Sequence, residues 1–400
     1  MNRIYLDNHA TTPVDPRVFS AMAPWFTEKF GNAASKTHAF GWEAEEACDI
    51  AREKIAYVIQ ANSSEIIFTS GATESINLAF RGLLKFKDKN KNHIVTLATE
   101  HKTVIDTCKE LEKSGIKTTF LPVDKNGFPN LNNFKNAITE ETFLVSILHA
   151  NNEIGVIQNI VEIGDICRDK KVIFHVDAAQ SFGKVPIDVD KMNIDLLSIS
   201  AHKVYGPKGI GALYVRRRNP RIQLEPLITG GGHEKGLRSG TLPVPLIVGF
   251  GKASEITLKK MALETESCLQ LRDLLLTGLL EGIEDLLVNG DMKSRLPGNL
   301  NVSIPYVNGE ALIMRLAPIS VSSGSACTSS VIEPSHVLKA LGVSDELAYA
   351  SIRFGIGRFN TSKDIESAID LVCNSVKKLR NMSRRNFKHK SKKEKIEIYH

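Results

Sequence analysis

Two apolar runs decide the fold of this chain: Val172-Ile-Phe-His-Val-Asp177 and Asp195-Leu-Leu-Ser-Ile-Ser200. Short apolar runs bounded by polar residues predict buried strands. Asp177 ends the first run, and Lys203 follows shortly after the second. In open α/β sheets, functional groups gather at the carboxyl ends of the strands. We therefore expect Asp177 and Lys203 at the same edge of a sheet.

The alternation of strands and helices continues on both sides of these runs. Seven strands are predicted, at Ile66–Thr69, His93–Leu97, Lys117–Leu121, Thr142–Leu148, Val172–Val176, Leu196–Ser200 and Gly211–Val215. Helical patterns lie between them, at Ala72–Lys85, Thr103–Lys113, Leu131–Ala137 and Ile160–Arg168. Strands that alternate with helices predict an α/β fold with a mostly parallel seven-stranded sheet covered on both faces.

The character of the chain changes after the Gly-rich stretch Gly230–Gly240. A long helical pattern runs from about 246 to 285, and later segments predict further strands and helices, at Gly298–Ile304, Ala317–Ser322 and Asp364 to about Leu379. We predict a large domain over residues 15–258 and a smaller α+β domain formed by residues 1–14 and 259–380. A basic tail, 381–400, has little hydrophobic periodicity and is expected to be mobile.

Charge and composition exclude several classes of protein. The tail holds seven Lys and Arg against two acids, so it supplies five of the six net positive charges of the 400 residues. A nucleic-acid binder spreads basic charge over a folded face, and this chain does not. No apolar stretch reaches the length needed to span a bilayer. Six scattered cysteines without a C-x-x-C pair indicate neither disulfides nor a zinc site, which favours the cytoplasm.

Asp177 and Lys203 together match the needs of pyridoxal phosphate. This cofactor requires a lysine for its Schiff base and an acid that keeps its pyridine nitrogen protonated. The alternative is an ordinary Asp–Lys ion pair at the edge of a sheet.

A phosphate group also needs donors, and the turn Thr69-Ser-Gly-Ala-Thr73 offers them. It leads from a predicted strand into a helix, where backbone N–H groups and the helix dipole attract anions. The Thr73 hydroxyl adds a donor, and Ser200 and His202 could supply others. The alternative is a helix capped by Ser or Thr without any ligand.

Two further polar segments follow predicted strands. His101 could stack on a cofactor ring or carry protons, or it could be a surface histidine. Asn151 and Asn152 could bind a cofactor oxygen, or they could only shape a turn.

Cys327 lies in the run Ser322-Ser-Gly-Ser-Ala-Cys-Thr-Ser-Ser330, which has no side chains large enough to pack. Such a run predicts a mobile surface loop, at about 321–334. Cysteine usually prefers burial, so this thiol is better placed as an accessible nucleophile. The other five cysteines lie in helical or apolar patterns and are predicted to pack in the interior.

Motifs along residues 3–380 resemble those of the cysteine desulfurases, specifically the long-loop group that serves iron–sulfur cluster assembly. The matching segments include Tyr5–Pro13, Phe30–Asn32, Thr69–Ser75, Thr99–Lys102, Asn151–Gly155, His175–Gln180, His202–Gly209, Gly230–Glu234, Arg238–Thr241, Ser322–Thr328 and Ser351–Phe354. The resemblance implies a fold-type I pyridoxal-phosphate enzyme that acts as a homodimer.

The resemblance also implies a role for each site residue. The catalytic residues would be Cys327, Lys203 and His101. The cofactor would be bound by Ala72, Thr73, Asn152, Asp177, Gln180, Ser200, His202 and Lys203, with Thr241 reaching in from the other subunit. Arg353 would bind the substrate carboxylate, assisted by Asn32. No resident metal is implied, although Cys327 would transiently contact an iron–sulfur cluster.

The implied reaction converts L-cysteine to L-alanine and leaves the sulfur on Cys327 as a persulfide. The implied acceptors are an iron–sulfur scaffold protein and other sulfur acceptors, with tRNA thiolation as a second use of the sulfur. Direct binding of nucleic acid or membrane is not implied.

Three departures and three alternatives accompany this interpretation. Ala201 and Ala179 replace residues that are often Gly and Thr in the family, and the basic tail differs from the tail associated with scaffold docking. An aminotransferase or a selenocysteine lyase would use the same Lys203 and Asp177 but would leave the loop thiol unexplained. A non-catalytic scaffold would not need Lys203, Asp177 and Cys327 together. A nucleotide-binding protein would require a Walker or dinucleotide spacing beside Gly230-Gly-Gly.

Overall fold

The computed structural model describes residues 3–323, 325–326 and 333–397, and their side chains over 3–323 and 333–382. The chain divides into two compact units. The larger unit comprises Thr11–Asn152 and Val156–Leu263, and the smaller unit comprises Met1–Ala10, Glu153–Gly155 and Glu264–His400. The smaller unit is therefore built from three separate parts of the chain.

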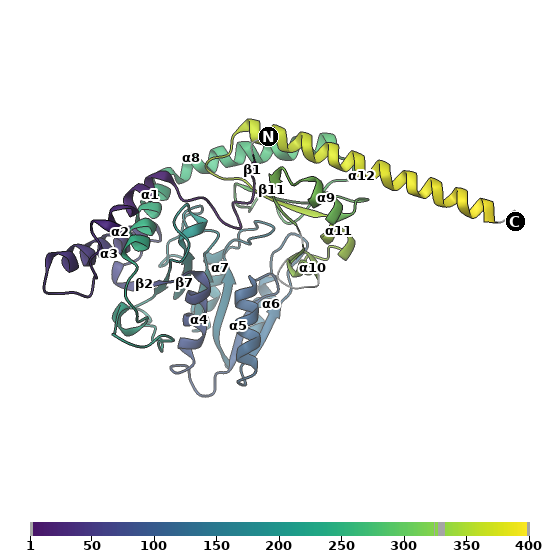
Figure 1. The fold of residues 1–400 in the computed structure, drawn as a ribbon. Coiled ribbons are helices and arrows are strands. Elements are labelled where there is room, and N and C mark those ends of the chain that lie inside the picture. Colours follow the sequence, from purple (N-terminus) through teal and green to yellow (C-terminus); the bar gives the residue numbers. More distant parts are fainter. Residues whose placement is uncertain (1–2, 324, 327–332, 398–400) are drawn as a thin grey trace. The chain divides into compact units, whose positions relative to one another are not determined.

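A seven-stranded sheet forms the centre of the larger unit (Figure 1). Its strand order is β2-β8-β7-β6-β5-β3-β4. Only β8 runs antiparallel to its neighbours, β2 and β7, and the other pairs are parallel. The strands are β2 (Ile66–Thr69), β3 (His93–Leu97), β4 (Lys117–Leu121), β5 (Thr142–Leu148), β6 (Ile173–Asp177), β7 (Leu196–Ser200) and β8 (Gly211–Val215). The predicted α/β fold with a mostly parallel seven-stranded sheet is confirmed.

Side chains that alternate along the strands pack into two cores, one on each face of the sheet. On one face Ile67, Ile94 and Leu213 pack with the helices α4 (Ala72–Leu83) and α5 (Lys102–Glu112). On the other face Phe68, Val95 and Tyr214 pack into a second cluster, with residues of α3 (Ala39–Val58), α7 (Ile160–Asp169) and the first part of α8 (Val244–Gly282). Burial on both faces explains why β5, whose seven residues are all buried, is a nearly continuous apolar run.

The seven predicted strands of this sheet agree with the structure except that β6 begins and ends one residue later, at Ile173 and Asp177. In the smaller unit the predicted strand Gly298–Ile304 is one residue shorter at each end, and Ala317–Ser322 is replaced by two short strands, Ile319–Ser320 and Ser322–Ser323. The predicted helices agree to within two residues, and the remaining helix of this group is α6 (Leu131–Ala137). Three helices were not predicted: α1 (Pro16–Met22), α2 (Pro24–Thr27) and α3. The buried stripe of α3 contains small residues such as Gly41, Ala44 and Ala51, so its hydrophobic periodicity is weak.

The smaller unit has its own sheet and its own core. Four strands pair in the order β12-β15-β10-β9, all antiparallel, and a separate parallel pair joins β1 (Ile4–Tyr5) to β11 (Ile319–Ser320). The sheet strands are β9 (Leu287–Val288), β10 (Asn299–Ser303), β12 (Ser322–Ser323) and β15 (Ser351–Gly355). Its core joins these strands to the second part of α8, to α9 (Gly309–Arg315) and to α12 (Ser362–Glu397). Short helices α10 (His336–Ala340) and α11 (Asp345–Tyr349) precede β15.

The last helix is longer than its sequence pattern predicts. Its backbone is helical to Glu397, whereas the periodicity suggested an end near Leu379. The apolar positions Ile365, Ala368, Val372, Val376 and Leu379 are buried, and the apolar periodicity of the sequence ends there. The mobility expected for residues 381–400 stays a prediction.

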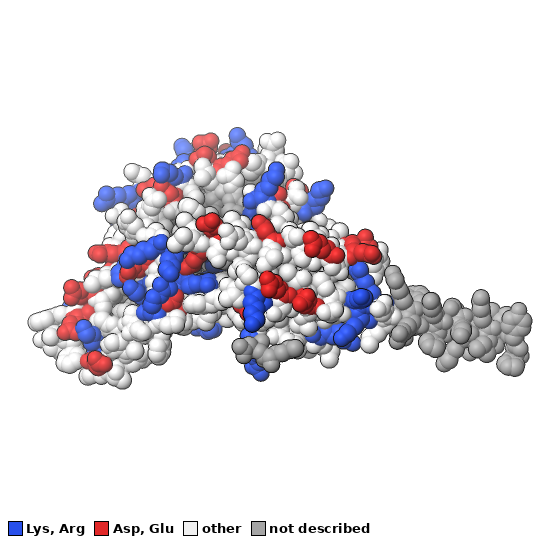
Figure 2. All heavy atoms as spheres, turned by 90° about the horizontal axis from the view of Figure 1, so that it is seen from above, with Lys and Arg blue, Asp and Glu red and all other residues white. Residues whose placement is uncertain are grey.

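Within the described residues, no helix combines the length and the apolar character that a membrane crossing requires. Acidic and basic side chains both occur across the face shown in Figure 2.

Candidate active site

The ends of β6 and β7, which are neighbours in the sheet, bring Asp177 and Lys203 to one region of the larger unit. Asp177 is the last residue of β6 and is 2% exposed. Lys203 ends a short 3₁₀ turn, Ala201–Lys203, that follows β7 directly. Parallel neighbours end at the same edge, which is why two residues distant in sequence meet there.

Electrostatics joins His101 to the same pair. Burial raises the pKa of the Asp177 carboxyl, while the charges of His101 and Lys203 and a hydrogen bond from the Ala179 N–H (2.9 Å) lower it without cancelling the effect of burial. A buried carboxyl with a raised pKa is stabilised in its charged form by a cationic partner. A protonated pyridine nitrogen is a partner of that kind.

His101 is the N-cap of α5, and its ring orientation is fixed locally. Its Nδ1 accepts a hydrogen bond from the Thr103 N–H at 3.2 Å and lies 3.0 Å from Thr103 Oγ1. Because Nδ1 accepts from a backbone donor, the proton of the neutral ring lies on Nε2. The ring is exposed, so Nε2 can exchange a proton with a bound molecule.

The predicted phosphate turn starts α4 without a side-chain cap. Gly71 is the N-cap, with φ +155°, and it has no side chain that could accept a hydrogen bond from the first N–H groups of the helix. A Cβ built on Gly71 would lie 3.9 Å from Ser200 Oγ, so Ser200 borders the same turn. Ala72 and Thr73 are the first helical residues. The structure therefore brings three predicted phosphate ligands together around a glycine that leaves space for an anion.

His202 is held in place by residues near the N-terminus. Its Nδ1 lies 3.0 Å from Thr11 Oγ1, and its carbonyl accepts hydrogen bonds from the N–H and the hydroxyl of Thr12. Burial and the positive charges of Lys203, Lys208 and Lys184 lower the pKa of His202 to about 4. His202 is therefore neutral near pH 7. Thr11 and Thr12 are positioning residues that sequence reasoning missed, although they belong to a matching motif.

Gln180 and the two asparagines have different environments. Gln180 is buried within the turn that follows β6. Asn151 is buried and donates from Nδ2 to the carbonyl of Thr99 at 2.9 Å, which ties its turn to the segment before His101. Of the two roles considered for these asparagines, the contact of Asn151 agrees with shaping the turn. Asn152 remains the candidate cofactor ligand.

Two predicted site residues of the larger unit lie apart from these contacts. Thr241 is exposed at the end of the Gly-rich segment. Asn32 is exposed, and its Oδ1 accepts the Ala34 N–H at 2.9 Å, so in this structure it caps a local turn.

Arg353 lies in the smaller unit, on β15, one of the two inner strands of its four-stranded sheet. Its Nη2 donates to Asp7 Oδ1 and to Ser322 Oγ, both at 2.7 Å, and the Ser322 hydroxyl donates to the same Asp7 oxygen at 2.9 Å. Asp7 and Ser322 therefore orient the guanidinium. Sequence reasoning missed both, although Ser322 opens the run that contains Cys327.

Cys327 lies outside the described residues. The structure describes short strands on either side of it: β13 (Ser325–Ala326) pairs antiparallel with β14 (Glu333–Pro334). Three of the five described cysteines, Cys48, Cys108 and Cys167, are buried as predicted. Burial raises the pKa of Cys48 and of Cys108 to about 12, so these thiols stay protonated.

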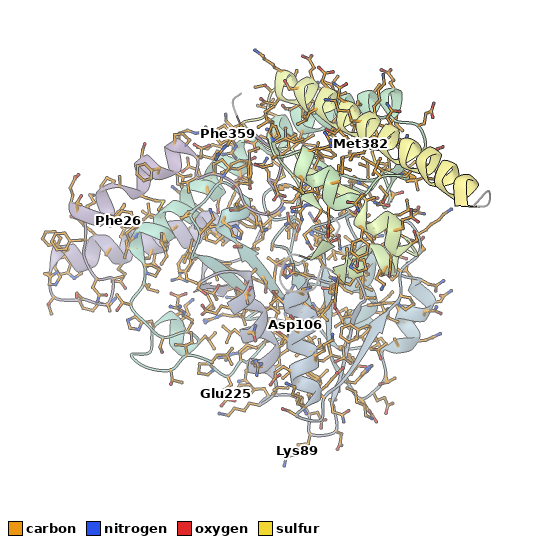
Figure 3. The ribbon with its side chains drawn as sticks, turned by 45° about the vertical axis from the view of Figure 1, so that its right-hand side comes forward. Phe26, Lys89, Asp106, Glu225, Phe359 and Met382 are labelled. Carbon is orange, nitrogen blue, oxygen red and sulfur yellow. The ribbon has the colours of Figure 1, made fainter. Side chains whose placement is uncertain are left out.

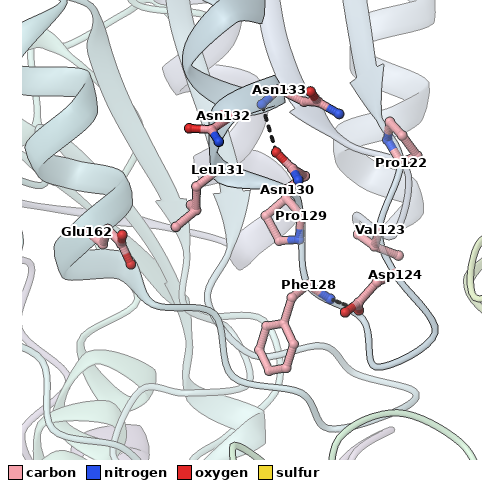
Figure 4. A pocket seen from close by; sticks show the side chains of 10 residues that line it. All are labelled: Pro122, Val123, Asp124, Phe128, Pro129, Asn130, Leu131, Asn132, Asn133 and Glu162. Atoms are coloured by element: carbon pink, nitrogen blue, oxygen red, sulfur yellow. Dashed lines mark hydrogen bonds between the residues drawn. The ribbon is translucent and has the colours of Figure 1, made fainter.

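An open hollow of about 710 Å³ lies elsewhere in the larger unit, between β4 and α6 (Figure 4). Its wall is shaped by turns in which Asp124 accepts the Phe128 N–H and Asn130 accepts the Asn133 N–H. None of the predicted site residues lines it. The hollow does not contribute to the site described above.

Comparison with known proteins decides the family. The profile of the family described as Aminotransferase class-V matches residues 4–367. A cysteine desulfurase named IscS from Rickettsia felis is 55% identical over 380 residues, which cover 95% of this chain and 92% of that protein. The chain belongs to the cysteine desulfurases of this family. The predicted family is thus confirmed, and the family depends on pyridoxal phosphate.

Solved structures resemble this desulfurase over nearly its whole length. One, described as a NifS-like protein, has a TM-score of 0.88 and 38% identity, and covers 94% of this chain and 100% of its own. Another, described as SspA in complex with cysteine, has a TM-score of 0.80 and 40% identity, over 90% and 100% of the two chains. The larger unit of the desulfurase also has the groups that the cofactor needs: a buried acid, a lysine and a turn with space for an anion.

Proposed function

We propose that this chain removes sulfur from L-cysteine, releases L-alanine and holds the sulfur as a persulfide on Cys327. The main support for this proposal is that the buried Asp177 lies within the electrostatic influence of Lys203 and His101, near the ends of neighbouring strands. The names of its relatives and the cysteine bound to one similar structure support the substrate.

The proposed cofactor site uses residues of the larger unit. Lys203 would hold pyridoxal phosphate covalently, Asp177 would bind its pyridine nitrogen, Gln180 and Asn152 would bind the ring hydroxyl, and His101 would stack on the ring. Ala72, Thr73, Ser200 and His202 would bind the phosphate. When bound, the cofactor supplies an electron sink that acidifies the α-carbon and accepts the electron pair left when the Cβ–S bond breaks.

Substrate binding and proton transfer fall to other side chains. Arg353 would bind the substrate carboxylate with its planar fork, which Asp7 and Ser322 orient, and Asn32 would assist. Lys203 would remove the α-proton once the substrate amine has displaced it. His101 would carry a proton at Nε2, because Nδ1 is engaged with Thr103.

Cys327 would complete the transfer. Its thiolate attacks the substrate sulfur, a new S–S bond forms as the Cβ–S bond breaks, and protonation of the carbon fragment yields alanine. An aminotransferase or selenocysteine lyase would use the same cofactor residues but would not place the sulfur on Cys327.

We propose a homodimer in which Thr241 of the partner subunit reaches the phosphate. Exposed aromatic side chains of the larger unit support a covered surface, since monomers rarely expose contiguous apolar patches. These side chains lie on or near α1, α2 and α3, and they are Phe19, Phe26, Phe30, Phe40 and Trp42. Phe26 is labelled in Figure 3. Phe30 and Phe40 stack with ring centroids 5.2 Å apart.

The proposed partners are an iron–sulfur scaffold protein and other sulfur acceptors, in the cytoplasm. The seven basic residues of the tail support an acidic partner, because opposite charges speed association.

The test is incubation of the purified protein with L-cysteine, followed by measurement of alanine and mapping of persulfide by mass spectrometry. We expect equal amounts of alanine and sulfur, with the persulfide on the peptide that contains Cys327. Alanine without any persulfide on Cys327 would contradict the proposed mechanism, and an absence of alanine would contradict the activity.

A further inference from the structure

A largely buried ion pair joins the start of α4 to the Gly-rich segment. Arg238 Nε donates to Glu74 Oε1 at 2.8 Å, and Arg238 Nη2 donates to Oε2 at 3.4 Å. The side chains are 21% and 15% exposed. Glu74 lies in the first turn of α4, directly after Thr73.

The Glu74 carboxylate also binds the turn to which the phosphate is assigned. Its Oε2 accepts the Ser70 N–H at 2.8 Å. Burial alone would raise the pKa of Glu74, but the hydrogen bonds from Arg238 and Ser70 hold it below its usual value. Glu74 is therefore negatively charged near pH 7. A helix N-terminus stabilises a nearby negative charge. Here the Glu74 carboxylate and a phosphate dianion would lie at the same helix N-terminus, where the two negative charges would repel each other.

We propose that Arg238 is a positioning residue for the cofactor's phosphate and acts through Glu74. It neutralises the Glu74 carboxylate and holds it on the Ser70 N–H, so that the phosphate meets the donors of the turn without an opposing charge. This inference rests on the proposed function, which assigns a phosphate to that turn.

The segment that carries Arg238 has a second, independent anchor. Glu234 accepts two hydrogen bonds from the Arg52 guanidinium, both at 2.8 Å, and one from the Phe68 N–H at 2.6 Å. The Glu234 side chain is 2% exposed. Replacement of Arg238 therefore removes a charge near the turn while the segment stays attached to α3 and β2.

The experiment measures the binding of ligands to the cofactor-free protein by quenching of tryptophan fluorescence. Pyridoxal phosphate and pyridoxal are compared, because only the first carries the phosphate. We expect Arg238→Gln to weaken pyridoxal phosphate by about tenfold and to leave pyridoxal unchanged. Arg238→Lys should keep most of the affinity, and inorganic phosphate should compete less well in Arg238→Gln than in the wild type.

The double variant decides whether Arg238 acts through Glu74. Glu74→Gln should bind pyridoxal phosphate at least as tightly as the wild type, and Glu74→Gln with Arg238→Gln should recover most of the lost affinity. Lys85→Gln is the matched control, since Lys85 pairs with Glu225 at 2.9 Å beyond the other end of α4 (Glu225 is labelled in Figure 3). This control should change neither affinity.

Two results would overturn the inference. In one, Arg238→Gln weakens pyridoxal and pyridoxal phosphate equally; in the other, the double variant recovers nothing. A wild-type protein that binds both ligands equally would instead show that the proposed phosphate site is wrong, and the inference would fall with it.

Discussion

The two units support the proposed reaction in different ways. In the larger unit, Asp177 and Lys203 lie at the ends of buried strands that are five residues long, and His202 is held by two threonines. In the smaller unit, Arg353 lies on a five-residue strand, but the strands on either side of Cys327 have two residues each. A cofactor must be held in one geometry, whereas a sulfur carrier must reach an acceptor. The five predictions below test this contrast.

The largest effect is expected in the larger unit, from Lys203→Ala. Loss of the covalent attachment should abolish the visible absorbance of the bound cofactor and lower turnover by more than about 1000-fold. Absorbance spectra and an alanine assay measure both, with Lys208→Ala as the control for a nearby exposed lysine. Wild-type absorbance in Lys203→Ala would refute the cofactor assignment.

Cys327→Ser should abolish sulfur transfer while leaving the binding of the cofactor and of cysteine intact. The cofactor spectrum and cysteine binding should remain, because they depend on the larger unit and on Arg353, while persulfide disappears and alanine formation falls by about 100-fold or more. Cys268→Ser, which changes a partly buried cysteine of the smaller unit, serves as the control. Parent-like desulfuration by Cys327→Ser would mean that another group accepts the sulfur.

Arg353→Lys tests the ordered part of the smaller unit. A lysine cannot reproduce the planar fork, so KM for cysteine should rise by about tenfold or more while the cofactor spectrum stays unchanged. Steady-state kinetics provides the measurement, and Lys363→Ala, at an exposed position of α12, is the control. An unchanged KM would remove Arg353 from the substrate site.

Acid should destabilise the larger unit specifically. Burial lowers the pKa of His149 to about 4 and that of His175 to about 3, so both are neutral in the folded state and become protonated on unfolding as pH falls below about 6.5. Their contribution is complete above that pH and is lost toward pH 4, at about 2 kcal/mol for each by pH 5. Urea unfolding at pH 7.5 and pH 5, followed by the fluorescence of Trp25 and Trp42, measures the loss. Buried Glu100 and Asp177 have raised pKa values and act in the opposite direction, so the wild type is compared with His175→Asn. An equal change in midpoint for both proteins would contradict the pKa direction of His175.

The smallest effect on catalysis is expected from deletion of residues 384–400. Turnover and cofactor binding should stay within about twofold, because these residues follow Leu379, where the buried apolar positions described for α12 and the apolar periodicity both end. Binding to an acidic scaffold protein should weaken, and the difference should shrink at high salt. A large fall in turnover without any partner would show that the tail contributes to the folded body.

Sequence predicted the larger unit well because its signals are local. Each strand is a single short run, and the candidate residues Asp177 and Lys203 lie at the end of β6 and shortly after the end of β7. The antiparallel direction of β8 was not predicted, yet the short connection at residues 201–210 has no room for the crossover helix that a parallel neighbour needs. In the smaller unit, β15 was missed because its two apolar residues, Ile352 and Phe354, are separated by the charged Arg353.

The positioning residues were missed for another reason. Asp7 meets Arg353, and Glu74 meets Arg238, only after the chain has folded. No periodicity or spacing marks such pairs, since each partner is an ordinary charged residue in its own segment. Within the candidate site, the sequence therefore suggests residues for chemical roles but not those that orient them.

The pairing of β1 with β11 has a consequence for synthesis on the ribosome. Ile4 and Tyr5 pair with Ile319 and Ser320, and Asp7 binds Arg353. At roughly 5–20 residues per second, translation of the intervening segment takes roughly 15–60 s. Ile4, Tyr5 and Asp7 must therefore wait for partners that are made much later. The larger unit can be completed during that wait, because its last residues, which end at Leu263, precede both Ile319 and Arg353.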